Sequence, residues 1–330
     1  MVAVQQVLSA PSLDQPTQPF NLAGGNPDNP TFEYTHSLTR ILSHYLHHAE
    51  EPPKRTATLL TQVSNPDKHK LEDHCWLLFH VLLGAAVDVP AFHPAQQRLI
   101  TLIQTIQHEP APECKGPSFW CQLPHILGLL HEWRCQYWAF EPFESDDQNP
   151  EPVFTAADIL NLSTFKALWC ASPPPNHSRG SYAHVGPSWG LWQICLTLEV
   201  PRIAEALVKN VPGVAAWFMI AGDKLRTLCR DNAECGFSRA RAPCRPEELY
   251  KGPDSWNAER WTFWRQRLDD ISKDDKLDPE TRQWAARGFG AMTPIDCSIK
   301  PSKSVAQQKE HGNKALRTNR FAILVDLESS

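Results

Sequence analysis

The sequence predicts an all-α fold, a multi-helix bundle or an irregular α-α array of about ten helices joined by long Pro-rich loops. Apolar residues recur at helical spacing in most segments, as in Leu71, Cys75, Leu78, Leu82 and Ala86. Proline is abundant, with 29 residues, and repeatedly follows Asn, His or Asp where such a segment begins. No alternation of strand and helix patterns occurs, which argues against an α/β fold.

Start and stop signals locate the first helices. Asn29-Pro30 predicts a helix from about Thr31 to Glu50, which ends at Pro52-Pro53. Asn65-Pro66-Asp67 opens the next helix, and Pro90 ends it. Later starts are expected at His93-Pro94, at a capping box formed by Thr155 and Asp158, at Asp254, and at Asp278-Pro279. A strongly apolar helix is expected over 119–140, and several helices are expected within 201–231.

Three regions follow from this pattern. Residues 1–30 are rich in Pro, Gln, Asn and Gly and predict a flexible N-terminal arm. Residues 31–292 form the helical domain, either as one body or as two lobes divided near the acidic stretch 141–154. Residues 293–330 form a basic tail, and residues 172–188 predict an unusually long loop.

Composition narrows the classes of function. The 32 basic and 37 acidic residues give a net charge of −5, which argues against a nucleic-acid-binding protein. No secretory signal and no apolar run of membrane-spanning length is found, so an intracellular protein of the cytoplasm, or of the nucleus, is expected. In that compartment the ten cysteines are expected to be reduced.

Three short motifs suggest hydrolysis or metal chemistry. Gly186 to Gly190 fits G-x-S-x-G, but no strands precede it to build a hydrolase sheet, so a loop ending in an N-cap serine is favoured. His131-Glu132 begins a zincin motif that fails because position 135 is Cys. His44 and His48, one helical turn apart, have metal-ligand spacing but no third ligand, so no metal is expected.

The chain is rich in tryptophan, with 12 residues, and aromatic side chains could line a ligand pocket. The candidate lining residues are Trp120, Trp133, Trp217, Trp261 and Trp264. His125 and His131 are the candidate acid–base groups of such a pocket. No nucleotide-binding glycine motif is present, and no cofactor is expected.

A series of motifs resembles one family in order and spacing. They are Trp120-Cys-Gln-Leu-Pro124 with Glu132-Trp133, Leu160 to Phe165, Leu196 to Glu199, Ala215-Ala-Trp217, and Arg260 to Trp264. Over about 31–292 the chain resembles the fungal domain-of-unknown-function family numbered 3632. The resemblance implies an all-helical intracellular protein and carries no catalytic residues.

Two hypotheses of function follow. The first is a non-enzymatic helical protein that binds a partner protein, since no credible catalytic set accompanies the large helical surface. The alternative is a cofactor-independent enzyme or small-molecule binder in fungal specialised metabolism, with an aromatic pocket between helices.

Overall fold

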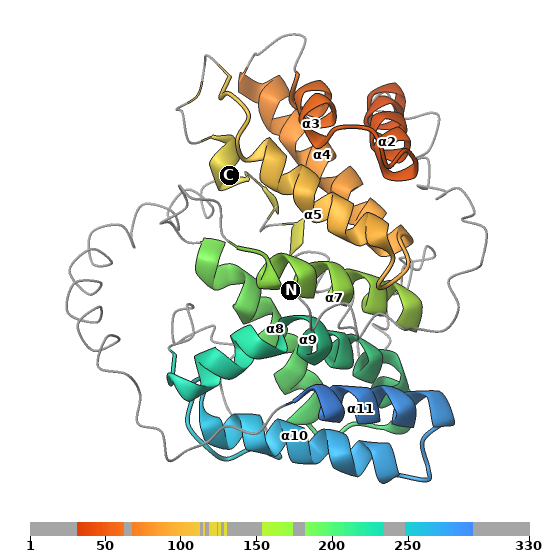
Figure 1. Ribbon diagram of the computed structural model, residues 1–330, viewed down its shortest axis with the longest axis vertical. Helices are drawn as coiled ribbons and strands as arrows, with labels where there is room; N and C mark the ends of the chain where they lie inside the picture. The colour runs from red at the N-terminus through yellow and green to blue at the C-terminus, as the bar shows by residue number, and fades with distance from the viewer. Residues whose placement is uncertain are drawn as a thin grey trace, which may run out of the picture.

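The computed structural model describes residues 32–62, 68–112, 154–173, 182–233 and 248–292, and short stretches between 115 and 130. Its helices follow one another along the long axis of the molecule, from α2 at one end to α10 and α11 at the other (Figure 1). Every regular element in these residues is a helix, which confirms the all-α prediction. None of the described helices has both the length and the apolarity needed to cross a membrane.

The first group of helices forms one end of the molecule. It consists of α2 (Phe32–His47), α3 (Pro53–Thr61), α4 (Lys68–Asp88) and α5 (Pro94–Ile106). The predicted start of α5 is confirmed, because the His93 imidazole accepts a hydrogen bond from the Ala95 amide at 3.1 Å. Pro53 was expected only to end the first helix, but it begins α3. A proline is tolerated at this first position because the N–H group that it lacks would have no acceptor within the helix.

The helix α7 (Ala156–Ala171) lies in the middle of the molecule and belongs to two cores (Figure 1). Its predicted capping box is confirmed: the Asp158 amide donates to Thr155 Oγ1 at 3.2 Å, and the Thr155 amide donates to Asp158 Oδ2 at 2.7 Å. Ile159, Leu162 and Phe165 pack into the core of α2–α5. Ala167 and Cys170 pack into the core of the helices that follow.

The second group of helices builds the other end of the molecule. It consists of α8 (Tyr182–Leu198), α9 (Ala204–Arg230), α10 (Ala258–Lys273) and α11 (Pro279–Ala291). The expected apolar face of α10 is confirmed, since Trp261, Trp264, Leu268 and Ile271 are all buried. The cap of α10 is Asn257 and not Asp254, and the predicted cap Asp278 of α11 is confirmed.

The loop predicted over 172–188 is wrong for its last part, because α8 already begins at Tyr182 and continues through Pro187. Ser188 is therefore neither an N-cap nor the nucleophile of a strand-to-helix turn, and it is buried inside the helix.

Close packing between helices explains why position 190 of α8 is a glycine. A Cβ at Gly190 would lie 2.8 Å from the Trp217 ring, so α8 and α9 can approach each other only without a side chain there.

The expected series of helices within 201–231 is instead the single helix α9. Pro212 and Gly213 lie inside it and are buried. A Cβ at Gly213 would lie 2.6 Å from Ser163 Oγ, so this glycine allows α9 to pack closely against α7. Tertiary packing overrides the helix-breaking tendency of the Pro-Gly pair.

The apolar helix predicted to begin at Phe119 is not continuous there. A short 3₁₀ helix, η1 (Trp120–Gln122), comes first. Leu123 and His125 then have positive φ angles of 44° and 67°, which a continuous α-helix does not allow. The flexible arm, the acidic stretch at 141–154 apart from Phe154, and the basic tail lie outside the described residues, so the three-region organisation stays a prediction.

Candidate partner-binding groove

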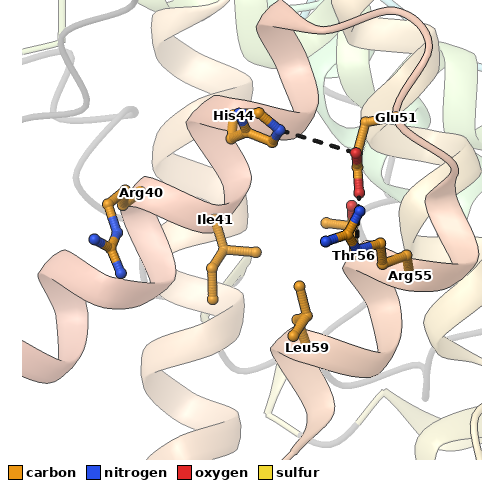
Figure 2. Close-up of a pocket in the computed structure, with 7 residues that line it drawn as sticks. All are labelled: Arg40, Ile41, His44, Glu51, Arg55, Thr56 and Leu59. Atoms are coloured by element: carbon orange, nitrogen blue, oxygen red, sulfur yellow. Dashed lines mark ion pairs between the residues drawn. The ribbon is translucent and has the colours of Figure 1, made fainter.

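A groove of about 280 Å³ lies at the surface between α2 and α3. Figure 2 shows Ile41 and His44 of α2 on the side toward Arg55 and Leu59 of α3, with Arg40 at the outer edge of the groove. Glu51, in the connection between the two helices, and Thr56 complete the lining. Both helices therefore contribute one apolar and at least one basic side chain to the same hollow.

The connection between α2 and α3 is held by a side chain from α5. The guanidinium of Arg98 donates hydrogen bonds to the backbone carbonyls of Tyr45 at 2.5 Å, His48 at 2.8 Å and Ala49 at 2.6 Å. The Tyr45 carbonyl lies in the last turn of α2 and the other two lie just after its end, where carbonyls lack a partner within the helix. Arg98 also lies over the Tyr45 ring at 4.3 Å, so the last turn of α2 is anchored to the core.

The polar side of the groove has more positive than negative charge. Glu51 Oε2 lies 3.9 Å from His44 Nε2, and Glu51 Oε1 lies 3.7 Å from Arg55 Nε (Figure 2). Arg40 has no carboxylate within ion-pair distance among the described residues. The groove thus has two arginines and a single acidic side chain, and only Arg55 of the two arginines contacts it. The Arg40 guanidinium and the remaining donors of Arg55 are accessible to an external anion.

The apolar side of the groove is formed by Ile41 and Leu59. Ile41 is partly buried against the core, whereas the Leu59 side chain is 43% exposed. Figure 2 shows these two side chains pointing into the space between the helices. The groove therefore offers a ligand both apolar contacts and hydrogen bonds from guanidinium groups, a combination that is typical of binding sites for other proteins.

The histidines predicted as weak metal ligands are exposed on α2. The rings of His44 and His48 stack with their centroids 4.1 Å apart, and His48 Nδ1 lies 2.9 Å from the His44 carbonyl. In the part of the chain that the structure describes, no group of three or more His, Cys, Asp or Glu side chains is placed to hold a metal. His44 instead contributes to the groove.

The proposed acid–base histidines are not brought to the groove. His125 is exposed in the turn after η1, and His131 lies outside the described residues. Two thiols also lack the character of nucleophiles: burial raises the pKa of Cys75 to about 12 and that of Cys170 to about 11. Both thiols remain protonated and unreactive at neutral pH.

The predicted pocket tryptophans are divided between the two cores, and Trp133 lies outside the described residues. Trp120 packs edge-on to His74, with centroids 6.4 Å apart, in the core of α2–α5. Trp217, Trp261 and Trp264 come together in the core of α8–α11, where each is almost fully buried. In these places the indole rings fill the interior.

An ion pair in the second core was not predicted from the sequence. Glu199 accepts hydrogen bonds from Arg260 Nε at 2.6 Å, Arg260 Nη2 at 2.8 Å and Trp264 Nε1 at 2.7 Å. Both charged side chains have 0% exposure. Burial alone would lower the pKa of Arg260, but the hydrogen bonds and the charge of Glu199 raise it above its usual value.

A sequence signal for this pair did exist. Arg260 lies on the same helical stripe as Trp264, Leu268 and Ile271, and a charged residue in an apolar stripe needs a partner. Its partner lies 61 residues earlier in the chain, where no local pattern points to it. The closed geometry, with every carboxylate hydrogen bond made inside the core, indicates a structural role.

A second buried polar cluster joins α7, α8 and α9. Ser163 Oγ lies 2.8 Å from Gln193 Nε2, and Trp217 Nε1 donates to Gln193 Oε1 at 2.9 Å. The three side chains satisfy one another's hydrogen bonds in the interior. This cluster fixes the register of the three helices around the glycines that let them approach.

Comparisons with curated proteins and with solved structures found no match. A family model described as a protein of unknown function (DUF3632) matches residues 79–268, a shorter range than the expected 31–292. The match begins inside α4 and ends inside α10, so it includes both buried polar clusters and leaves out α2 and α3 with their groove. Because it covers more than half of the sequence, the chain belongs to the DUF3632 family.

Proposed function

We propose that this chain is a non-enzymatic interaction protein that binds a segment of a partner protein in the groove between α2 and α3. The observation that carries the proposal is the surface-exposed apolar floor of Ile41 and Leu59 between the two arginines Arg40 and Arg55. Apolar floors with arginine at their edges are typical of protein–protein contacts.

The size of the groove supports a protein ligand. Pockets that enclose drug-sized molecules have volumes of roughly 300–1,000 Å³. The groove, at about 280 Å³, lies just below that range and suits one or two side chains of a bound segment. The alternative, an aromatic pocket for a small molecule, has less support because Trp120 lies in a different core from Trp217, Trp261 and Trp264.

The proposal is tested by isolating the full chain gently from its own host and examining the complexes by native mass spectrometry. A Leu59→Asn variant removes the apolar floor, and Val208→Asn is the matched control on α9, since the two side chains are 43% and 38% exposed. We expect wild type and Val208→Asn to retain the same stoichiometric protein partner and Leu59→Asn to lose it. A wild-type chain without a partner, or equal retention by both variants, contradicts the proposal.

A further inference from the structure

We infer that the α2–α3 groove recognises an acidic segment that places an aliphatic side chain between two carboxylates, an assignment that rests on the function proposed above. The carboxylates lie at Arg40 and Arg55, and the aliphatic side chain lies over Ile41 and Leu59. The ligand class follows from three features of the groove: its unbalanced charge, the basic ridge that continues it, and its apolar floor.

The unbalanced charge selects an anionic ligand. Arg40 is exposed, and no described carboxylate lies within ion-pair distance of its guanidinium. The Arg55 side chain is 71% exposed, and its contact with Glu51 is 3.7 Å long, which leaves donors directed to solvent. Guanidinium groups hydrogen-bond carboxylates in a planar, bidentate manner, so each arginine can hold one acidic side chain.

A ridge of arginine and histidine side chains continues the groove along α2. His36, Arg40, His44 and His48 follow one another at intervals of four residues, and all four are exposed. From Thr35 to Ala49 the chain carries no acidic residue. An extended or helical acidic segment can therefore continue beyond the groove without meeting like charge between Thr35 and Ala49.

The apolar floor determines which kind of side chain of the ligand can enter the groove. Ile41 on α2 and Leu59 on α3 form this floor, and the buried Thr56 also lines the groove. The volume of about 280 Å³ suits a branched aliphatic side chain and its neighbour. Charge alone gives weak contacts at an exposed surface, so the aliphatic side chain supplies most of the affinity and the arginines supply the selectivity.

The test is a selection from a random-peptide phage library on the immobilised full chain, followed by fluorescence anisotropy with the selected peptides. We expect the peptides to carry Asp or Glu on both sides of Leu or Ile. The double variant Arg40→Glu/Arg55→Glu should bind them roughly ten-fold more weakly. The matched control Lys251→Glu/Lys276→Glu makes the same change of charge at exposed sites near α10 and should bind within about two-fold of wild type.

Other outcomes separate the inference from the proposed function. The selected peptides could lack acidic residues and bind the arginine variant as well as wild type, but bind Leu59→Asn more weakly. That result would refute an acidic ligand and would still support the groove as a binding site. Equal binding when serine replaces the aliphatic residue also overturns the inference. Peptides that bind Leu59→Asn and Val208→Asn equally, or no enrichment at all, overturn both. Analytical ultracentrifugation could show that wild type is a dimer and that Leu59→Asn is a monomer. The groove would then hold a second copy of the chain, which refutes the inference of an acidic segment as its ligand.

Discussion

Removal of one partner from the buried pair of Glu199 and Arg260 should be among the most damaging single changes in the second core. The substitution Glu199→Leu leaves the guanidinium of Arg260 without a counter-charge in a site of 0% exposure. It also removes the acceptor of Trp264 Nε1. Breaking a buried ion pair in this way costs about 3–5 kcal/mol, a large share of a total stability of roughly 5–15 kcal/mol.

The size of the effect can be measured by urea unfolding followed by tryptophan fluorescence. With a denaturant slope of about 3 kcal/mol/M, a loss of about 4 kcal/mol lowers the midpoint by about 1.3 M. Arg260→Met should cause a similar loss, because it leaves the carboxylate of Glu199 unpaired. The double variant, in which both charges are replaced by apolar side chains, should lose less than either single variant.

The double-mutant comparison decides whether this reasoning is correct. Trp264 still lacks an acceptor in the double variant, so a residual loss of about 1–3 kcal/mol is expected. The reasoning is refuted if the loss in the double variant equals the sum of the two single losses. It is also refuted if Glu199→Leu alone costs less than about 1 kcal/mol, since the site would then admit water to the remaining charge.

Three further predictions concern packing and pH. Gly190→Ala should destabilise the fold by about 1–2 kcal/mol, because its Cβ would lie 2.8 Å from the Trp217 ring. Burial lowers the pKa of His74, so at this residue the unfolded chain takes up more protons below about pH 6.5. The contribution of His74 to the free energy of unfolding should therefore fall from pH 7.5 to 5, and wild type should lose stability relative to His74→Phe over that range. Partial desolvation and the charge of Asp158 raise the pKa of Asp88 to about 6. The contribution of Asp88 to the free energy of unfolding should therefore fall as pH rises from 4 to 7, and wild type should lose stability relative to Asp88→Asn over that range.

Each of these predictions has its own control. Gly84→Ala is the match for Gly190→Ala, because nothing lies within 4 Å of a Cβ there and helix propensity should give a gain of up to about 1 kcal/mol. Equal effects of the two alanines would contradict the packing argument. The two pH predictions are measured as urea midpoints of variant and wild type at each pH. A difference between variant and wild type that does not change with pH would contradict them.

Local signals in the sequence were enough for several helix starts. The capping box of Thr155 and Asp158, the His93-Pro94 start and the Asp278 cap are formed within a few residues of chain, and the structure confirms all three. The helical face of Leu71, Cys75 and Leu78 is buried as its period predicts. These features depend on neighbouring residues only.

Where distant contacts decide the structure, sequence reasoning was incomplete. The segment 182–188 has loop-forming residues, yet it is helical because α8 packs closely on α9 at Gly190. The same holds for Pro212 inside α9. His44 was noted for metal-ligand spacing, but its neighbours in the groove come from a helix that was not predicted at all. A groove between two helices depends on their relative position, which a single sequence pattern does not contain.

The double membership of α7 has a consequence for how the protein unfolds. Ile159, Leu162 and Phe165 of this helix belong to the core of α2–α5, and Ala167 and Cys170 belong to the core of α8–α11. Neither core can open at α7 without uncovering apolar side chains of the other. We therefore expect the two ends of the molecule to unfold as one cooperative unit, so that ligand binding or a substitution at one end changes the free energy of local opening at the other.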